Sequence, residues 1–401
     1  MPAEHEKGKQ KRRIFCVITQ GELGGAQQFV SQLAQHINPE LFDFHVVWGA
    51  SSSAAFARSL PAHVTHATAQ HLVRHIMSPI EDVRAIFELR RLMRMYKPDV
   101  VLCISSKAGF VGSLAAHGIR DEFPELDVIY RIGGWTFNDP WPRWKQRLFV
   151  ALERFSARWK DTIIVNNAHD LEQARALRIT PRKELACIHN GLDPFLPFMT
   201  RDEARTALNQ KIPTEATLLQ PDWWVGTIAN LYPTKDIATF IRAASRVEGH
   251  VRFVVIGDGE QRAQLEQAVQ EAALTHRFFF LGSIPEAWKY IPGFDVFVLA
   301  SVKEGFPWAL LEAMAARVPS IATRVGAVPE MIPDESCGIV VEPGDSDAIA
   351  EAIVHLLGHD KKRQDIAIAA HQRVINTFSL RVMIDAYERL FSRSVSALGG
   401  R

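Results

Sequence analysis

The sequence predicts an α/β protein made of two doubly wound halves, each with a parallel sheet covered by helices. The chain has 401 residues, 47% of them apolar, and this length exceeds what a single hydrophobic core usually supports. Short continuous apolar runs alternate with longer amphipathic stretches, as expected for parallel strands buried on both faces. The alternation stops near residue 192 and then starts again, so two domains are expected.

Five strands are predicted in the first half. The stretch "GELGGAQQFVSQLAQHI" follows the first of them and predicts a glycine loop that leads into a helix. A longer helix is predicted over 78–96, because its apolar residues keep helical spacing, and Pro98 ends it. The predicted strands are 13–19, 43–49, 99–105, 127–134 and 161–167.

The second half repeats the pattern with six predicted strands. A segment rich in Pro, Asn and Thr precedes it, so we place the domains at 1–191 and 192–378. In sheets of this kind ligands bind at the carboxyl ends of the strands, and two such halves are expected to face each other across a cleft. The predicted strands are 225–231, 251–259, 278–284, 295–301, 319–324 and 337–343.

Composition excludes several functional classes. The net charge of +1 argues against a nucleic-acid-binding protein as a whole, although positive charge gathers in the first half. The four cysteines lie far apart, which favours a reduced, cytoplasmic protein without a Cys-x-x-Cys zinc site. No apolar run precedes Ile14, so neither a signal peptide nor an anchor is predicted.

Two glutamates mark the strongest candidate site. Glu304 lies in the turn after a predicted strand, and Glu312 lies eight positions later inside a predicted helix. Pro307 suits the first position of that helix, where its missing N–H leaves no hydrogen bond unmade. A helix N-terminus attracts phosphate, and Gly305 permits close approach of the backbone. The spacing therefore suggests a ligand that contains a diphosphate, with Glu304 near one end of the ligand and Glu312 near the other.

Lys235 follows the first strand of the second half and offers a cation to the same phosphates. A Gly-x-Gly turn, Gly257–Gly259, ends the next strand, although such turns are common in α/β proteins. Taken singly, Glu304 is also explained as a carboxylate at a helix N-terminus, and Glu312 as an exposed helical glutamate. Their combination with Lys235 favours a binding site.

These residues resemble those of the retaining nucleotide-sugar glycosyltransferases of the GT-B fold, in the large glycogen-synthase-like group four. The resemblance rests on the E-x7-E pattern, "LLEAMAA", and a following turn with Gly326, Ala327, Pro329 and Glu330. It extends over nearly the whole chain through "GELGGAQQFVSQLA", "HNGLD" and "IGDGEQRAQLE". The first half is similar to the polysaccharide and lipid-linked-glycan branch. The family also implies that a C-terminal helix, 379–396, crosses back onto the first domain.

The resemblance implies a role for each matched position. Glu304 contacts hydroxyls of the donor sugar and Glu312 those of the ribose, while Lys235 holds the diphosphate of a UDP or GDP type of donor. Neither a metal ion nor a further cofactor is implied, because cationic groups and a helix terminus neutralise the leaving group. The other implied donor-binding positions are Gly24, Gly25, Asn230, Gly282, Ser283, Gly305, Phe306 and Pro307.

The chain departs from the family at two donor positions. Asn230 stands where an arginine is common, and Gly133 stands where many members carry a histidine near the donor sugar. Arg131 or the backbone of Gly133 is expected to take over part of that contact. Lys107 is expected on the acceptor side, with a surface salt bridge as the other explanation.

The segment 141–160, "WPRWKQRLFVALERFSARWK", interleaves basic and aromatic residues. Its apolar side chains share one helical face, as in a helix that lies on an anionic membrane. A helix packed into the core with a solvated basic rim fits the same pattern. With the membrane interpretation, the acceptor is a lipid-linked saccharide at the cytoplasmic face of the membrane.

Three other functions compete with glycosyl transfer. A nicotinamide oxidoreductase is disfavoured, because "GELGGAQQ" lacks the G-x-G-x-x-G spacing and the second strand ends in glycine. A nucleotide-sugar epimerase of the same fold remains, although Glu304 and Glu312 favour transfer. A catalytically weak sugar-nucleotide-binding protein also remains, because of Gly133 and Asn230.

Overall fold

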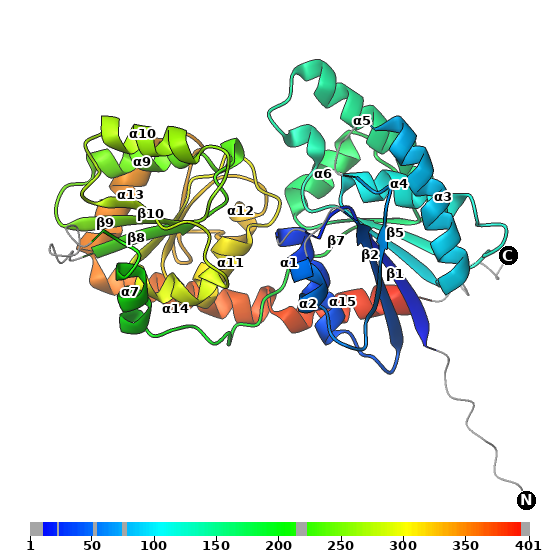
Figure 1. The fold of residues 1–401 in the computed structure, drawn as a ribbon. Coiled ribbons are helices and arrows are strands. Elements are labelled where there is room, and N and C mark those ends of the chain that lie inside the picture. Colours follow the sequence, from blue (N-terminus) through cyan, green and yellow to red (C-terminus); the bar gives the residue numbers. More distant parts are fainter. Residues whose placement is uncertain (1–10, 22–23, 51–53, 74–77, 214–222, 394–401) are drawn as a thin grey trace, which may run out of the picture. The chain divides into compact units, whose positions relative to one another are not determined.

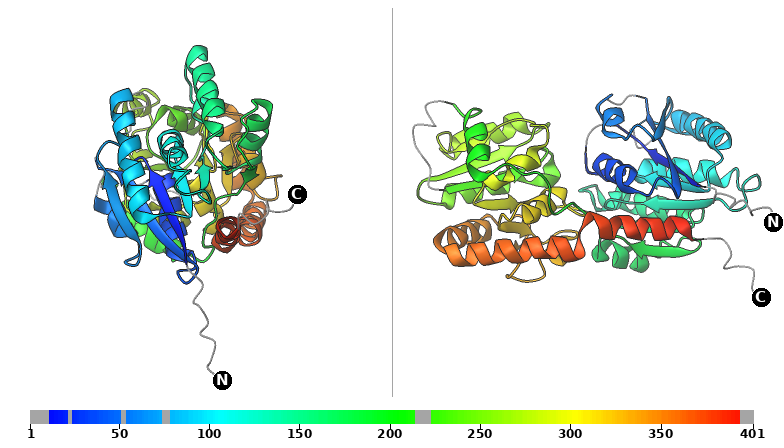
Figure 2. Two further views of the ribbon diagram at one scale, coloured as in Figure 1. Left: turned by 90° about the vertical axis from the view of Figure 1, so that its right-hand side faces the viewer. Right: turned by 90° about the horizontal axis from the view of Figure 1, so that it is seen from below.

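The computed structural model describes residues 11–21, 24–50, 54–73, 78–213 and 223–393. They form two compact units: unit 1 contains Met1–His189 and Met383–Arg401, and unit 2 contains Asn190–Val382. Each unit has one parallel sheet with helices on both of its faces (Figure 1, Figure 2). The predicted architecture of two doubly wound α/β halves is confirmed.

The described residues of unit 1 form a seven-stranded sheet in the order β3-β2-β1-β4-β5-β6-β7. Five of these strands are the predicted ones. The two additional strands, β3 and β7, form the two edges of the sheet, where side chains are less completely buried. The strands are β1 (Arg12–Ile18), β2 (Phe42–Gly49), β3 (Thr65–Ala69), β4 (Val100–Ile104), β5 (Asp127–Arg131), β6 (Thr162–Val165) and β7 (Glu184–Cys187).

Helices cover both faces of this sheet. One core joins α3, α4, α5 and α6 to side chains of every second strand position. On the other face Phe29 of α1 contacts Tyr387 of α15, with ring centroids 5.2 Å apart. The helices of unit 1 are α1 (Gly25–His36), α2 (Ala54–Ser59), α3 (Pro79–Tyr96), α4 (Ser106–His117), the 3-10 turn η1 (Thr136–Asn138), α5 (Arg143–Ala157) and α6 (Ala168–Ala176), and α15 (Leu380–Ser392) joins them from the C-terminal end.

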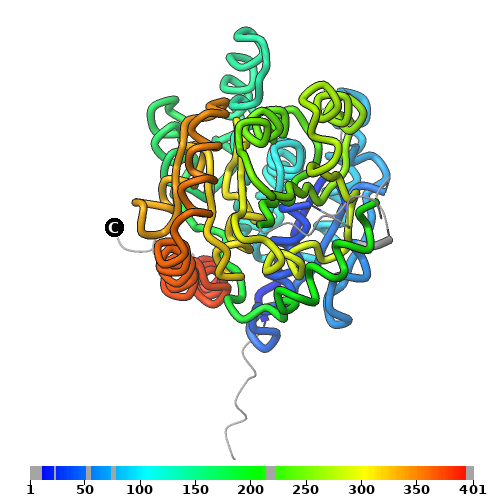
Figure 3. Tube along the Cα trace, turned by 90° about the vertical axis from the view of Figure 1, so that its left-hand side faces the viewer, coloured from blue at the N-terminus to red at the C-terminus, as the bar shows by residue number. Residues whose placement is uncertain are grey.

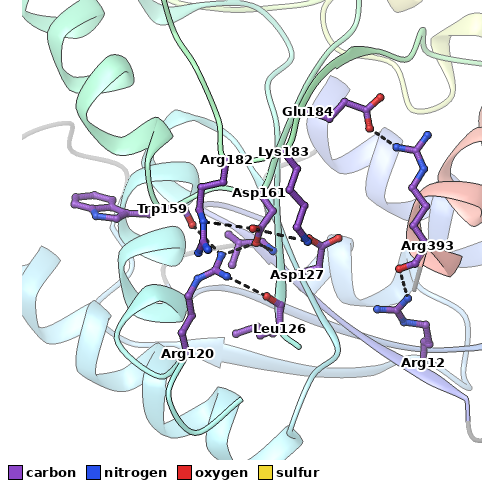
Figure 4. A network of polar contacts seen from close by, with 11 residues as sticks. Arg12, Arg120, Leu126, Asp127, Trp159, Asp161, Arg182, Lys183, Glu184 and Arg393 are labelled. Atoms are coloured by element: carbon purple, nitrogen blue, oxygen red, sulfur yellow. Dashed lines mark hydrogen bonds and ion pairs between the residues drawn. The ribbon is translucent and has the colours of Figure 1, made fainter. Parts of the chain in front are cut away.

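Ion pairs and hydrogen bonds join the amino ends of the strands of unit 1 (Figure 4). The carboxylate of Asp161, before β6, accepts hydrogen bonds from Arg120 at 2.5 Å and from the Val128 backbone N–H at 2.9 Å. Arg393, just after α15, donates to Glu184, and its carbonyl accepts a hydrogen bond from Arg12 at 2.9 Å. Because these contacts occupy the amino edge, functional groups are expected at the opposite, carboxyl edge.

A fully buried lysine holds α5 against the sheet. Lys160 donates to Glu153 at 3.2 Å and to Ser156 at 2.8 Å, and its ammonium lies 4.0 Å from the ring centroid of Tyr130. Burial lowers the pKa of Lys160, and the nearby carboxylate of Glu153 opposes that shift. Tyr130 also donates to Glu153, at 3.0 Å. The inner side of α5 is therefore fixed by a satisfied polar network.

The described residues of unit 2 form a six-stranded sheet in the order β10-β9-β8-β11-β12-β13. All six strands correspond to predicted ones. They are β8 (Trp223–Ile228), β9 (Val251–Ile256), β10 (Phe278–Phe280), β11 (Val296–Leu299), β12 (Ser320–Thr323) and β13 (Ile339–Val341).

Two hydrophobic cores lie on the two faces of this sheet. Figure 3 shows the Cα trace with unit 2 toward the viewer. Helices α9, α10 and α13 supply one core, and α7, α11 and α14 supply the other. The helices of unit 2 are α7 (Arg201–Asn209), η2 (Pro233–Lys235), α9 (Ile237–Arg246), α10 (Arg262–Glu271), η3 (Ala287–Gly293), α11 (Trp308–Ala315), α12 (Val328–Met331), α13 (Ser346–Gly358) and α14 (Asp360–Thr377).

Both sheets reverse their strand order at one point. In unit 1 the chain moves outward from β1 to β2 and β3, and then returns to place β4 on the other side of β1. Unit 2 does the same around β8 and β11. At such a switch point the loops after the two central strands diverge and leave room for a ligand at their carboxyl ends. The fold therefore indicates two candidate positions, one in each unit.

Candidate active site

The switch point of unit 2 brings Lys235 and Glu304 together. Lys235 ends the 3-10 turn after β8, and Glu304 lies in the loop after β11, the strand adjacent to β8. The Nζ atom of Lys235 donates to Oε1 of Glu304 at 2.6 Å. The same two loops are joined through their backbones, because the N–H of Val302 donates to the carbonyl of Thr234 at 2.9 Å.

Ser301 also donates a hydrogen bond to the carboxylate of Glu304. Its hydroxyl donates to Oε1 of Glu304 at 2.7 Å, and Ser301 itself is 1% exposed. Lys235 and Ser301 thus share one oxygen, and the described residues donate no hydrogen bond to Oε2 of Glu304. A carboxylate fixed through one oxygen keeps the other oxygen for a ligand hydroxyl.

A third loop packs directly on the Glu304 backbone. Gly326 has a φ of 49°, and a β-carbon at that position would lie 2.2 Å from the carbonyl oxygen of Glu304. The N–H of the next residue, Ala327, donates to the carbonyl of Gly305 at 2.8 Å. Only glycine tolerates both the positive φ and the close approach, so Gly326 sets the position of the Glu304 loop.

The Gly257–Gly259 turn supports the segment that leads to Lys235. A β-carbon on Gly257 would lie 2.0 Å from the carbonyl oxygen of Ala229, and the N–H of Leu231 donates to the carbonyl of Asp258 at 3.0 Å. Gly257 in turn donates its N–H to the carbonyl of Gly282 at 2.9 Å. The loops after β8, β9 and β10 are therefore joined side by side at the carboxyl edge. Within this edge, the predicted donor-binding residues Asn230 and Ser283 are exposed.

Helix α11 begins one residue later than predicted. Pro307 precedes the helix with a ψ of 112°, and Trp308 is the first helical residue. Proline still suits this place, because it has no N–H and its φ of −72° is compatible with a helix start. Phe306 is 4% exposed and packs its ring against Phe378, with centroids 5.3 Å apart. The phenyl ring is therefore part of the core, and the donor contact predicted for 305–306 remains a prediction.

Glu312 is buried, which excludes the explanation that it is an ordinary exposed helical glutamate. It is the fifth residue of α11 and is 7% exposed. A carboxylate is seldom buried unless something pairs with it, so a functional or packing reason is needed for it. Its predicted role with a ribose remains a prediction.

At the switch point of unit 1, the described residues of the two loops meet through hydroxyl groups. The hydroxyls of Thr19, after β1, and Ser105, after β4, are 2.6 Å apart. Ser105 has a φ of 102°, which is rare for a residue with a side chain, and its hydroxyl caps α4 by accepting from the Ala108 N–H at 3.3 Å. Nearby, Gly24 precedes α1 and Gly25 is its first residue, and both are exposed, as an approaching phosphate requires.

The predicted acceptor-side residues have different surroundings. Lys107 forms an ion pair with Asp82 of α3, and its side chain is 11% exposed. Arg131 is 3% exposed; its guanidinium lies 4.1 Å from the ring centroid of Phe29 and beside Tyr387. Burial lowers the pKa of Arg131 and raises that of Tyr387 to about 12.

Gly133 is exposed two residues after Arg131, and a β-carbon there would lie 3.3 Å from a guanidinium nitrogen of Arg131. A side chain at position 133 would therefore crowd that arginine. In this conformation Arg131 links β5, α1 and α15, and a contact with the acceptor stays a prediction.

Sequence reasoning missed Ser301 and Ser105. Serine is common in loops, and neither residue belongs to a pattern that distinguishes it from other serines. The importance of Ser301 follows from its hydrogen bond to Glu304, and that of Ser105 from its backbone angle. Neither property can be obtained from residue type or spacing alone.

No group of three or more His, Cys, Asp or Glu side chains suited to a metal ion occurs within the described ranges. The sequence has an Asp-x-Asp pattern at Asp345–Asp347, a pattern that often binds metal ions. Here Asp345 caps α13 by accepting from the Ala348 N–H at 2.9 Å, and Asp347 pairs with Arg246. This pattern therefore serves the start of a helix.

In the part of the chain that the structure describes, every helix is too short or too polar to cross a membrane. All four cysteines are free.

Comparison with known proteins assigns both halves of the chain. Residues 24–191 match the family model described as "Glycosyl transferase 4-like domain". Residues 223–359 match the model described as "Glycosyl transferases group 1". The second match includes Lys235, Glu304 and Glu312.

The similarity to one curated protein extends over the whole chain. UDP-Gal:alpha-D-GlcNAc-diphosphoundecaprenol alpha-1,3-galactosyltransferase of Escherichia coli is 26% identical over 392 residues, which are 95% of this chain and 97% of the relative. Among solved structures, sucrose-phosphate synthase from Thermosynechococcus elongatus has a TM-score of 0.80 at 19% identity, covering 95% of this chain and 98% of that one.

A second solved structure, Anabaena HepE in complex with UDP and glucose, has a TM-score of 0.79 at 19% identity and covers 95% of this chain and 99% of that one. At this identity the two structural similarities establish the fold. Together with the family matches over both units, they lead to one conclusion: the chain belongs to the group 1 glycosyltransferases and has their two-domain GT-B type of fold.

Proposed function

We propose that the protein transfers a sugar from a nucleoside-diphosphate sugar to a saccharide acceptor, with retention of anomeric configuration, as a member of the glycogen-synthase-like group four. One observation carries the proposal: at the switch point of unit 2, Glu304 is fixed through Oε1 by Lys235 and Ser301. A cation and a carboxylate oxygen thus lie side by side at the edge of the sheet where ligands generally bind in folds of this kind.

The two charged groups have separate tasks in this proposal. Lys235 transfers its ion pair from Glu304 to the incoming diphosphate, which carries more negative charge than one carboxylate. Glu304 keeps its hydrogen bond from Ser301, and its Oε2 accepts a hydrogen bond from a hydroxyl of the donor sugar. The N–H groups at the start of α11 face the same diphosphate, and Glu312 accepts hydrogen bonds from the ribose hydroxyls.

The chemical step follows from these positions. The bond between the anomeric carbon and the diphosphate oxygen breaks, and its electron pair leaves with the diphosphate. The acceptor hydroxyl attacks the same face of the sugar and gives its proton to the departing phosphate oxygen. Lys235 and the α11 terminus stabilise the negative charge that develops, and Glu304 stabilises the positive charge on the sugar ring. No step in this scheme needs a metal ion.

The names of relatives support a choice of substrates. The galactosyltransferase from E. coli is named for UDP-galactose and a diphosphoundecaprenol-linked acceptor, and HepE was solved with UDP and glucose. We therefore propose a UDP-type donor, with a GDP-type donor as the second possibility, and a lipid-linked or other cell-surface saccharide as the acceptor. Such an acceptor places the protein in the cytoplasm, in peripheral contact with the inner face of an anionic membrane.

Activity on a panel of UDP-, GDP- and ADP-sugars tests the proposal. Release of nucleoside diphosphate is measured with and without membrane lipid extract, and with and without EDTA. We expect release that depends on lipid extract, survives EDTA, and gives a product whose anomeric proton coupling matches that of the donor. Inverted product would contradict retention, and loss of activity in EDTA would contradict metal independence.

The same panel separates the alternatives. Interconversion of sugars without release of nucleoside diphosphate would assign the protein as an epimerase. Nucleotide binding without turnover would assign it as a sugar-nucleotide-binding protein. The Lys235→Met variant is expected to bind nucleoside diphosphate about tenfold more weakly, because it loses one charge-assisted contact to phosphate.

A further inference from the structure

Exposed apolar side chains of unit 1 gather on two helices. The most exposed large apolar residues in its described part are Leu41, Ile80, Val83, Phe87, Met95, Trp144 and Phe155. All of them except Leu41 lie on α3 or α5. The exposed fraction reaches 68% for Ile80, 63% for Phe87 and 67% for Trp144. Such concentration on one part of a surface indicates an interaction site.

The outer side of α5 carries a continuous apolar stripe. Trp144, Ala151 and Phe155 are exposed, Leu148 between them is half-buried, and the four follow one another at spacings of four, three and four residues. These spacings place them on one face of the helix. The inner side is occupied by Phe149 and by the Glu153 network with Lys160. The interpretation of this helix as a core-packing element therefore explains only its inner face.

Arginines border this stripe and have no acidic partner. Among the described residues, no ion pair reaches Arg143, Arg147 or Arg154 on α5, or Arg158 directly after it. On α3 two of the arginines have acidic partners, because Arg84 pairs with Glu81 and Arg94 pairs with Glu122. Positive charge without an acidic partner therefore lies next to exposed apolar area along α5.

The C-terminal part of α5 adjoins an open hollow of about 410 Å³. Arg178 and Thr180, which follow α6, contribute to its wall together with Arg154 and Arg158. The remaining lining residues are Ala151 and Phe155, which belong to the apolar stripe. Guanidinium groups and hydroxyls are common ligands of phosphate, and this hollow offers three of the former and one of the latter.

Both helices belong to one layer of unit 1. Helix α4 packs between α3 and α5 in the core on one face of the sheet, and Figure 1 shows the three helices on that side. Helices in one layer present their outer sides in the same general direction. We define the α3–α5 surface as the exposed Ile80, Val83, Phe87, Trp144 and Phe155, the half-buried Leu148, and the four arginines without an ion pair, Arg143, Arg147, Arg154 and Arg158.

We propose that the α3–α5 surface lies on an anionic lipid bilayer, with the apolar side chains inserted among the headgroups and the arginines bound to lipid phosphates. A second copy of the chain is a poorer occupant. A twofold interface would place the same unpaired arginines opposite one another, and like charges in contact are repulsive. Nucleic acid would satisfy the arginines but would leave the protruding Trp144 and Phe87 without an apolar partner. A bilayer satisfies both groups.

Flotation of the full-length protein with vesicles tests this proposal. The vesicles are phosphatidylcholine alone, or an equimolar mixture with phosphatidylglycerol. We expect binding to the anionic vesicles that weakens with added salt, because lipid phosphates attract the arginines through a screened field. Arg154→Glu with Arg158→Glu should lower the partition coefficient at least about tenfold. Phe87→Ser with Trp144→Ser should lower it by a similar factor, at low and at high salt.

Matched variants in unit 2 control for charge and hydrophobicity. Lys211→Glu with Lys361→Glu makes the same change in net charge at two exposed lysines. Val354→Ser with Ile368→Ser removes apolar side chains that are 54% and 62% exposed. Both controls should float like the wild type. Equal loss in the controls, or equal binding of the wild type to both kinds of vesicle, would overturn the proposal.

Two further outcomes would also overturn it. A dimer in light scattering that Phe87→Ser with Trp144→Ser dissociates would assign the surface to a second copy. Tighter binding to a single-stranded oligonucleotide than to anionic vesicles would assign it to nucleic acid. The inference deepens the proposed peripheral role, but flotation is measured without donor or acceptor. Its failure would therefore leave glycosyl transfer to a soluble acceptor standing, and a failure of transfer would leave vesicle binding standing.

Discussion

The two switch points of the molecule have the same topology, but neutral groups meet at one and charged groups at the other. In unit 1 the loops after β1 and β4 meet through two neutral hydroxyls, those of Thr19 and Ser105, at 2.6 Å. In unit 2 the loops after β8 and β11 meet through an ammonium and a carboxylate, those of Lys235 and Glu304, also at 2.6 Å. The fold thus supplies the meeting point, and the residues placed there decide what can happen at it.

The difference indicates which unit performs the chemistry. A departing diphosphate needs positive charge and fixed dipoles, and these are found at the unit 2 switch point. The loops there are also interlocked through Gly326 and Gly257, which approach neighbouring backbones too closely for any side chain. In unit 1 the predicted charged residues are less accessible: the side chain of Lys107, paired with Asp82, is 11% exposed and Arg131 is 3% exposed, whereas the side chain of Lys235 is 26% exposed. Each prediction below changes one side of this comparison.

The largest effect is expected for Glu304→Ala. Removal of the carboxylate that stabilises charge on the sugar should lower kcat by about 10²–10³-fold. Nucleotide affinity should largely survive, because Lys235 and the α11 terminus remain. Steady-state release of nucleoside diphosphate and calorimetric titration with the nucleotide measure the two quantities. Turnover equal to the wild type would remove Glu304 from the site.

Gly326→Ala should come next, with kcat lowered about 10²-fold, because a methyl group would push the Glu304 loop away from its position. The control is Gly358→Ala, where the added β-carbon meets no atom within 4 Å and φ is not positive. That control should retain full activity. If the two variants had the same kcat, the packing of the Gly326 turn on Glu304 would not matter for catalysis.

Ser301→Ala should lower kcat about tenfold, because one hydrogen bond to a charged carboxylate is lost. Since Ser301 is a positioning residue, we expect the effect in kcat and little change in nucleotide affinity. Ser245→Ala, which removes an exposed hydroxyl bonded to the Arg242 carbonyl, serves as the control. A change confined to stability, with kcat preserved, would make Ser301 purely structural.

The smallest effects are expected at the unit 1 switch point. Ser105→Ala removes a helix cap and should lower the free energy of unfolding by about 1 kcal/mol in urea denaturation. The separate variant Thr19→Val removes the hydroxyl that pairs with Ser105. Its kcat should change less than that of Ser301→Ala. A loss in Thr19→Val as large as that in Glu304→Ala would mean that both switch points take part in catalysis.

Much of this organisation could be predicted from the sequence. Strands buried on both faces give continuous apolar runs, so the five inner strands of unit 1 and all six strands of unit 2 could be predicted from the sequence. The edge strands β3 and β7 could not, because "THATA" and "ELAC" are short and only partly buried. Glu304 and Lys235 were identified from their places after strands, and the structure joins them.

The sequence by itself determined two α/β halves, the position of Glu304 and Glu312 around a helix start, and the amphipathic character of α5. Tertiary structure decided that Ser301 fixes Glu304, that Glu312 and Arg131 are buried, and that the stripe on α5 faces outward. The physical reason is that the spacing of apolar residues and the residue types reflect which face of each segment is buried. Hydrogen bonds between distant loops, and the side of a helix that remains uncovered, depend on which segments the fold brings together.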